Sequence, residues 1–272
     1  MREEAVAGQF YPEDPKELKE DILKYLRNAH KISQKSYGII VPHAGYSFSG
    51  QIAANAYNAI SKQKFDTFII LGTNHSSNET SISLEDFQTP LGIVKNDKRF
   101  SEELVKLKIE VNEKDQALEH SIEVQIPFLQ ILFHNIKIVP MAVSFSDFKE
   151  CKEFSEKIIK VAEKLSRKIC IISSGDLTHY GPYYNYTPFN PGRSKVYAID
   201  RKAMDLISEL RAKEFFEYCK NTTICGISSI SAGIEICRQL GAKKSIILKY
   251  SNSGDLTKDY DNCVSYASLV IG

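Results

Sequence analysis

The sequence predicts an α/β protein in which a central mixed, mainly parallel sheet is flanked by helices. Short apolar runs with the composition of buried strands alternate along the chain with longer segments of helical periodicity. No Pro-, Gly- or Ser-rich linker divides the 272 residues, so we expect a single domain over residues 1–272. Three apolar runs end close to a histidine, and in open α/β sheets the carboxyl ends of parallel strands gather ligand sites.

In the first half of the chain, hydrophobic periodicity and capping residues predict each element. Asp14 is a suitable N-cap, and Pro15 fits the first turn of the helix that follows. The expected elements are a helix over 14–28, a strand over 38–41, a helix over 50–62, a strand over 67–75, a hairpin over 81–95, a short helix over 99–107 and a helix over 118–133. Pro127 should kink the last helix, because proline removes a backbone donor and clashes with the preceding turn.

The second half continues the same alternation. The expected elements are a strand over 137–143, an amphipathic helix over 147–165, a strand from 168, an aromatic loop over 180–190, three helical segments within 194–240, and strands over 245–250 and 263–271. The last helical segment should begin near Cys225. This alternation implies a sheet that is covered by helices on both faces.

Composition excludes several classes of protein. The formal net charge of +1 gives no general attraction to nucleic acid or anionic lipid, so neither is expected as a partner. No apolar stretch approaches the length of a membrane helix, and the charged N-terminus lacks a signal-peptide core, so a cytoplasmic location is expected. The six cysteines contain no CxxC pair, which argues against a zinc ribbon; Cys170 and Cys237 in particular should be buried and reduced.

Two histidines come just after predicted strands. His43 follows Pro42 at the end of one apolar run, and His75 ends another. A neutral imidazole is a common metal ligand, and Tyr46 and Asn74 are candidates to orient the two rings. The alternative is a pair of satisfied loop histidines, but the repeated position favours one shared polar site.

Asp176 and His179 follow the third strand with two residues between them. If this turn is helical, the two side chains share a face, and a carboxylate beside an imidazole can raise its basicity as a general base requires. The alternative is a loop-stabilising Asx turn with an exposed histidine.

Cys225 lies among small and hydroxylic residues where a helix is expected to begin. A helix N-terminus lowers the pKa of a thiol and favours the thiolate, which binds metals. The alternative is a small buried hydrophobe, and these residues alone do not favour Cys225 over the other five cysteines.

His120 stands within Glu119-His-Ser-Ile-Glu123. The two glutamates are expected to share a solvated helix face; alternatively, His120 and Glu123 reach the pocket. His30 and His134 are expected on the surface. Four tyrosines either line a pocket mouth or cover hydrophobic surface: Tyr180, Tyr183, Tyr184 and Tyr186.

Taken together, the short motifs of this chain resemble those of the Memo family over essentially the whole sequence. The matching segments are Ala7–Pro12, Pro42–Tyr46, Leu71–His75, Glu119–Glu123, Ser174–His179 and Cys225-Gly226. The resemblance implies a fold related to the class III extradiol dioxygenases, which use non-haem iron. It also implies His43, His75 and Cys225 as metal ligands, with Asp176, His179 and His120 as candidate catalytic residues in the same pocket.

The resemblance implies iron or copper as the metal, with zinc as an alternative. The dioxygenases use two histidines and a carboxylate; a thiolate in the third position is softer and oxidisable, so ring cleavage does not follow from the fold. We therefore expect a metal-dependent redox enzyme with an unknown small substrate, in which His179, oriented by Asp176, moves protons.

Two other functions fit the same residues. One is a module without catalysis that binds phosphopeptides or other anionic ligands, with Arg193 and the helix N-terminus at Cys225 as donors. The other is a zinc hydrolase, since catalytic zinc sites commonly have three protein ligands and a water. Genes of the family often accompany radical-SAM and AMMECR-type proteins, so proteins of both types are expected partners.

Overall fold

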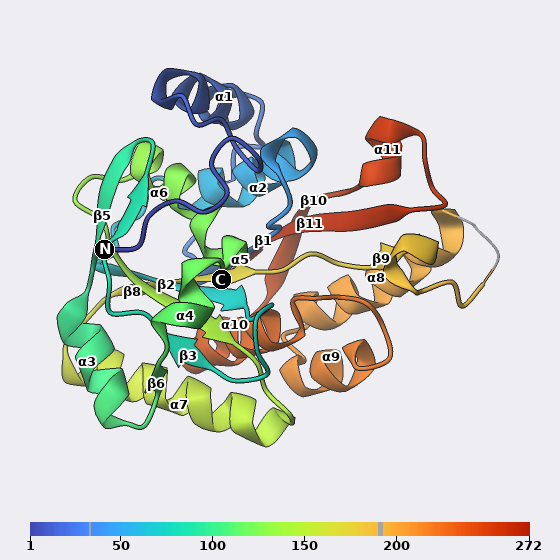
Figure 1. The fold of residues 1–272 in the computed structure, drawn as a ribbon. Coiled ribbons are helices and arrows are strands. Elements are labelled where there is room, and N and C mark those ends of the chain that lie inside the picture. Colours follow the sequence, from blue (N-terminus) through green and yellow to red (C-terminus); the bar gives the residue numbers. More distant parts are fainter. Residues whose placement is uncertain (33, 190–192) are drawn as a thin grey trace.

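Four parallel strands form the centre of the sheet. They are β1 (Gly38–Val41), β8 (Ile169–Ser174), β2 (Thr67–Thr73) and β7 (Lys137–Val143), in that spatial order. The structure is a computed structural model that describes residues 1–32, 34–189 and 193–272 (Figure 1). All four strands are almost fully buried, as expected for parallel strands that are covered on both faces.

Shorter or antiparallel strands complete both sides of this centre. On one side β11 (Cys263–Ile271) runs antiparallel to β1, and β10 (Ser245–Asn252) runs antiparallel to β11. On the other side β3 (Ser81–Ile82) and β5 (Gly92–Asn96) both pair with β7. The strand β4 (Phe87–Thr89) forms a hairpin with β5, and β6 (Glu110–Val111) pairs with β3. The short strand β9 (His179–Tyr180) pairs with β11. The predicted mixed sheet with a parallel centre is confirmed.

Helices cover the sheet on its two faces (Figure 1). One face carries α1 (Pro15–Arg27), α2 (Tyr46–Ile60) and α6 (Ile126–Leu132). The other carries α3 (Lys98–Lys106), α7 (Phe148–Lys164), α8 (Arg193–Ser208), α9 (Ala212–Cys219) and α10 (Ile227–Gln239). Alternate residues of β2 divide between the two cores, with Ile69 and Leu71 in one and Phe68 and Ile70 in the other, as the two-residue period of a strand requires.

Aspartates cap two long helices, and the predicted cap at Asp14 is one of them. Asp14 accepts hydrogen bonds from the backbone N–H groups of Lys16 and Glu17, at 2.9 and 2.8 Å. Asp147 accepts one from Glu150 at 2.9 Å and so begins α7. Each cap satisfies backbone donors that have no partner within the first turn of a helix.

The prediction of one kinked helix over 118–133 is wrong. The chain forms α4 (Glu113–Ala117), α5 (His120–Glu123) and then α6, and Pro127 lies in the first turn of α6. Proline is well placed there, because its missing N–H would have no partner within the helix. The predicted hairpin over 81–95 is narrower than expected, since β3 pairs with β7 and β6 and only β4 and β5 form the hairpin.

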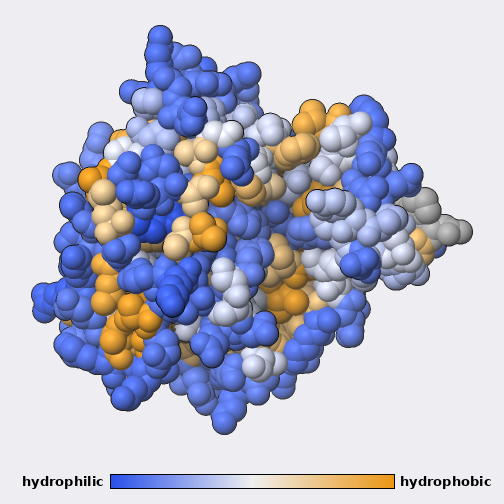
Figure 2. Space-filling model, viewed as in Figure 1, coloured by the Kyte–Doolittle hydropathy of each residue, from blue (hydrophilic) through white to orange (hydrophobic). Residues whose placement is uncertain are grey.

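Cysteines and surface residues follow the sequence expectations. The six cysteines all lie in the described ranges and are free, and Cys170 and Cys237 are fully buried. Among the residues that the structure describes, none of the helices combines the length and apolar character that a membrane crossing needs. On the face drawn in Figure 2 hydrophilic residues predominate, and hydrophobic residues form separate patches.

Candidate metal centre

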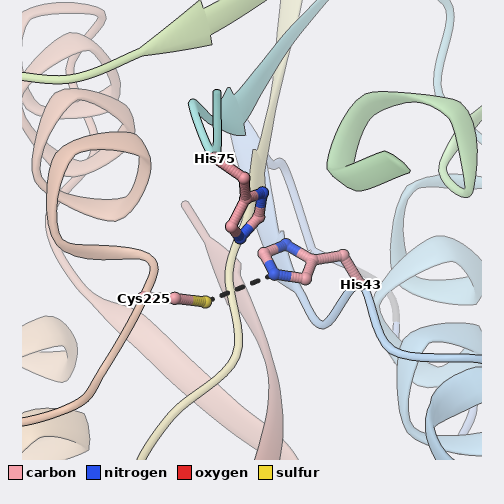
Figure 3. Close-up of side chains that lie close together, drawn as sticks. All are labelled: His43, His75 and Cys225. Carbon is pink, nitrogen blue, oxygen red and sulfur yellow. Dashed lines mark hydrogen bonds between the residues drawn. The ribbon is translucent and has the colours of Figure 1, made fainter. Parts of the chain in front are cut away.

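Three side chains from distant parts of the sequence meet at the carboxyl ends of the parallel strands. His43 follows β1, His75 follows β2, and Cys225 precedes α10. In Figure 3 the two rings and the thiol point toward one another. One ligand atom from each residue lies within 4.8 Å of those of the other two. The strand-end pattern predicts that the two histidines meet, and the resemblance alone predicts that Cys225 joins them.

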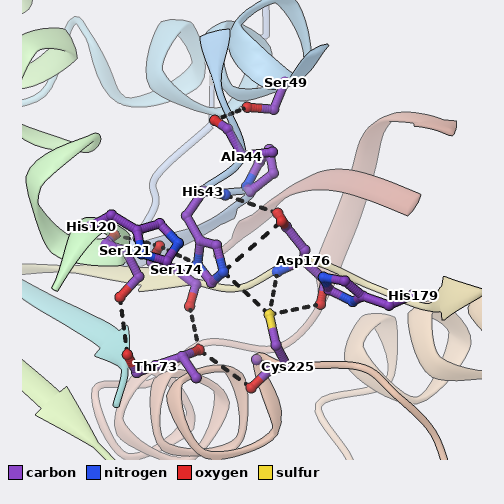
Figure 4. A network of polar contacts seen from close by, with 12 residues as sticks. His43, Ala44, Ser49, Thr73, His120, Ser121, Ser174, Asp176, His179 and Cys225 are labelled. Carbon is purple, nitrogen blue, oxygen red and sulfur yellow. Dashed lines mark hydrogen bonds and ion pairs between the residues drawn. The ribbon is translucent and has the colours of Figure 1, made fainter. Parts of the chain in front are cut away.

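The hydrogen bonds around Ser174 set the tautomer of His43. The Ser174 hydroxyl donates to the backbone oxygen of Ser121 at 2.7 Å and accepts from the Gln125 side-chain amide at 2.9 Å. A hydroxyl has only one proton to donate, so it accepts from Nδ1–H of His43, which lies 3.1 Å away. The lone pair of His43 is therefore on Nε2, the nitrogen that faces Cys225 (Figure 4).

The carboxylate of Glu119 accepts the ring N–H of His75, as the Ser174 hydroxyl does for His43. Both of its carboxylate oxygens lie close to Nδ1 of His75, at 3.0 and 3.1 Å, and one accepts the backbone N–H of His75 at 2.9 Å. Burial opposes ionisation, but the hydrogen bonds from the ring and the backbone of His75 lower the pKa of Glu119 to about 2. An ionised carboxylate accepts Nδ1–H and leaves the Nε2 lone pair of His75 free. The expectation of a solvated Glu119 is wrong: the residue is 1% exposed.

Cys225 is held where two glycines meet. Its sulfur lies 3.2 Å from Nε2 of His43 and accepts the backbone N–H of Asp176 at 3.2 Å. A Cβ atom on Gly175 would lie 2.5 Å from the Cα of Gly226, so only glycine allows this approach. Burial, and then the charge of Asp176, raise the pKa of the Cys225 thiol. This is opposite to the lowering expected from a helix N-terminus, because burial disfavours the charged thiolate.

Asp176 and His179 lie near His43 and Cys225 (Figure 4) but do not form the predicted pair. The turn after β8 is not helical, and no hydrogen bond joins these two side chains in the described residues. Instead, Asp176 accepts the backbone N–H of His43 at 2.9 Å, and burial raises its pKa to about 7. Nδ1 of His179 lies 3.0 Å from the backbone oxygens of both Leu177 and Thr223, so Nδ1–H donates and Nε2 is free.

His120 reaches the pocket as well. Its ring stacks on that of His75 with centroids 4.7 Å apart and meets the edge of His43 at 5.2 Å. Burial lowers its pKa, which favours the neutral ring. His75, Glu119 and His120 also bring ligand atoms within 4.8 Å of one another. Glu123, the other candidate of this segment, points away and is fully buried.

Several predicted supporting residues have other roles. The Tyr46 hydroxyl donates to the backbone oxygen of Val124 at 2.7 Å and does not hold a histidine ring. Asn74 organises its own loop and donates to the carboxylate of Asp115 at 3.0 Å. The residues that do orient the rings, Ser174 and Glu119, each begin one of the matching motifs, but nothing in their spacing distinguishes them from neighbouring polar residues. His30 and His134 are exposed, as predicted.

The aromatic loop borders the pocket at His179. The ring of Tyr184 meets that of His179 edge-on at 5.2 Å, whereas Tyr183 is exposed and Tyr180 is buried. Arg193, the cation of the anion-binding alternative, begins α8, and its side chain lies outside the described part of the structure. A cavity of about 280 Å³ adjoins Cys225 and is lined by Thr73, Phe216 and Lys220 among others.

The fold and these side chains define an α/β protein with a candidate His₂Cys metal centre at the carboxyl edge of its parallel strands. A family model described as Memo-like protein matches residues 2–270, and the chain belongs to this family. MEMO1 family proteins of Methanosarcina barkeri and Methanocaldococcus jannaschii are 34% and 39% identical to it; the matches cover 100% of this chain and 100% and 99% of theirs.

A solved structure shares the fold. The crystal structure of the uncharacterized protein JW3007 from Escherichia coli K12 matches 88% of this chain and 100% of its own, with a TM-score of 0.54 and 10% sequence identity. At this identity the likeness extends to the fold alone.

Proposed function

We propose that this protein binds iron or copper through His43, His75 and Cys225 and acts as a metal-dependent redox enzyme on a small substrate. The observation that carries the proposal is the convergence of three ligand atoms from separate segments within 4.8 Å. Two imidazole nitrogens and a sulfur form a donor set that suits iron, copper(I) or zinc.

The hydrogen bonds of the site support the same conclusion. Ser174 and Glu119 each accept a ring N–H, so both histidines present an Nε2 lone pair. This arrangement resembles the outer hydrogen bonds that orient metal-bound histidines in other proteins.

Iron or copper would supply one-electron redox chemistry at this position. The chain's own residues would hold and move protons beside it. His179 has a free Nε2 in the pocket, and its ring is fixed by two backbone carbonyls rather than by Asp176. Neutral His120 and the buried carboxyl of Asp176 are the other two groups in reach, and we assign all three as acid or base candidates.

Metal analysis of anaerobically reconstituted protein tests the proposal. We expect the wild type to bind iron or copper and both Cys225→Ala and His43→Ala to lose most of it while keeping their circular dichroism spectra. Cys263→Ala, which removes a buried free cysteine elsewhere, is the matched control and should bind as the wild type does. Equal metal content in all four proteins would refute the proposed ligand set.

Two further assays, of hydrolysis and of peptide binding, separate the two alternative functions. Uptake of zinc only, together with ester or amide hydrolysis, would favour a hydrolase with the same three ligands. Binding of a phosphorylated peptide that survives a chelator would favour a binding module. The expected association with radical-SAM and AMMECR-type proteins stays a prediction from the resemblance.

A further inference from the structure

The first residues of the chain cross the front of the molecule beside the candidate metal centre. We call residues 2–11 the N-terminal strap. Figure 1 shows it as the dark blue ribbon that runs from the N-terminus near β5 toward α1. The strap begins as a bridge between Arg2 and Phe87 of β4. It contains two side chains that are almost fully buried, those of Arg2 and Tyr11.

The strap surrounds the carboxylate of Glu123. One oxygen accepts Arg2 Nη1 and the backbone N–H of Ala5, the latter at 2.9 Å. The other accepts the backbone N–H of Val6 at 3.1 Å and the hydroxyl of Tyr11 at 2.5 Å. The Arg2 and Glu123 side chains are only 3% and 0% exposed. Four donors from the strap therefore meet one buried carboxylate of α5.

The rest of the Arg2 guanidinium holds the segment that orients His75. Nε donates to the backbone oxygen of Gln116 at 3.1 Å, and Nη2 donates to that of Glu119 at 3.2 Å. Glu119 is the residue whose side chain binds Nδ1 of His75. The ion pair thus fixes the backbone of Glu119 from one side and α5, which begins directly after Glu119, from the other.

The strap also contacts the pocket directly. The ring of Phe10 packs on that of His120 with centroids 4.9 Å apart. The backbone oxygen of Phe10 accepts the N–H of Tyr46 at 2.7 Å, in the segment that follows His43. The strap therefore contacts the ring of His120, the segment that follows His43, and the backbone of Glu119, whose side chain holds His75.

We propose that Arg2 and Glu123 are positioning residues of the metal centre, and that the N-terminal strap holds Glu119, and through it His75, in the orientation that binds metal. This inference rests on the proposed function. It predicts that weakening the Arg2–Glu123 ion pair changes the coordination of a bound metal. Neither residue touches the candidate ligands, because Arg2 and Glu123 act through the backbone of Glu119 and through α5.

Cobalt(II) absorption tests this inference, since a thiolate ligand gives a charge-transfer band and the d–d bands report coordination geometry. The full-length wild type should bind cobalt with a band that Cys225→Ala lacks. In Glu123→Gln we expect cobalt affinity to fall about tenfold or more, with shifted d–d bands. Tyr11→Phe removes one donor to Glu123 and should shift both readouts in the same direction by less.

A second buried carboxylate supplies the matched control. Asp97 is 2% exposed, accepts the Thr67 hydroxyl at 2.6 Å and lies 3.5 Å from Arg167, at the opposite end of β2 from His75. Asp97→Asn should lower thermal stability but leave cobalt affinity and spectrum unchanged.

The outcomes distinguish two failures. A wild type without the Cys225-dependent band would refute the proposed metal centre itself. The role of the strap alone would be overturned if the wild type shows the Cys225-dependent band and the variants do not differ from it. That outcome requires wild-type cobalt affinity and spectrum in folded Tyr11→Phe, and in Glu123→Gln if that variant folds. Equal spectral changes in Asp97→Asn would also overturn it, because the effect would then reflect general destabilisation.

Discussion

Each candidate histidine ligand depends on one hydrogen-bond acceptor behind its ring. For His43 the acceptor is the Ser174 hydroxyl, which is fully buried and whose own proton is committed to Ser121. For His75 it is the ionised carboxylate of Glu119. The two acceptors differ in charge, so the hydrogen bond to His75 is charge-assisted whereas the one to His43 is not.

Replacing Ser174 with alanine should weaken metal binding. The change leaves the buried Nδ1–H of His43 without its acceptor, which costs about 1–3 kcal/mol, whereas the Gln125 amide still donates to the backbone oxygen of Pro42 at 3.0 Å. His43 is then free to rotate or to change tautomer, so we expect metal affinity to fall about 10- to 100-fold. Isothermal titration with the metal under anaerobic conditions measures the change.

The neighbouring residue provides the control for this prediction. The Ser173 hydroxyl is buried and has no hydrogen-bond partner among the described residues. Ser173→Ala should therefore bind metal as the wild type does and be as stable or more stable. If both variants bind metal equally well, Ser174 does not orient His43.

At this scale the sequence predicts the ligands better than the residues that support them. His43 and His75 are found from their positions after apolar runs, but Cys225 is selected only by the resemblance. Glu119 could not be recognised as buried, because its partner is a backbone and ring that approach from β2. The pKa of Cys225 was expected in the wrong direction because burial outweighs the nearby helix N-terminus.

The elements of the fold bring the ligands together through two close approaches. The turn after β8 passes the start of α10 at Gly175 and Gly226, which places the sulfur of Cys225 beside Asp176 and His43. The second close approach is between β2 and α5, where a Cβ on Gly72 would lie 2.4 Å from the hydroxyl oxygen of Ser121. Close packing at both places leaves little room for the strand ends to move.

Gly175→Ala should separate the end of β8 from the start of α10. The added methyl group would lie 2.5 Å from a backbone atom, so the backbone must shift. We expect lower thermal stability and a loss of most metal binding, because the sulfur of Cys225 moves away from His43. Melting curves and metal analysis of the same samples check both effects.

Gly45→Ala is the matched control for that change. Gly45 caps α2 in the segment after His43, but the nearest atom to an added Cβ is 3.5 Å away. This variant should bind metal normally. Normal binding in Gly175→Ala as well would show that the glycine contact does not position Cys225.

Elements with a clear local signal were predicted closely. The predicted strand over 137–143 coincides with β7, and Asp147 begins α7 as expected, because apolar runs and caps are local properties. The region 118–133 was predicted wrongly because its apolar residues from Ile122 to Leu129 share one core although α5 and α6 are separate helices. The two-residue strands β3, β6 and β9 exist only through their partners in the sheet.

For the whole molecule, the candidate centre joins segments that are far apart in the sequence. His43 and Cys225 are separated by 182 positions and belong to elements on opposite faces of the sheet, since α2 follows one and α10 follows the other. A metal that bonds to both, and to His75 between them, is a cross-link that forms only in the folded chain. Binding of such a metal would therefore be coupled to folding.

This coupling predicts that metal raises the melting temperature of the whole protein. At a free metal concentration one hundred times the dissociation constant, binding stabilises the folded state by about 2.7 kcal/mol. For a domain of this size that corresponds to roughly 5–10 °C, and somewhat less if unfolded chains also bind metal through cysteine or histidine. Scanning calorimetry of metal-free protein, with and without added metal under anaerobic conditions, measures the shift. Cys225→Ala should show little of it, whereas Cys263→Ala should show all of it. An equal shift in both variants would mean that the metal stabilises the fold from some other position.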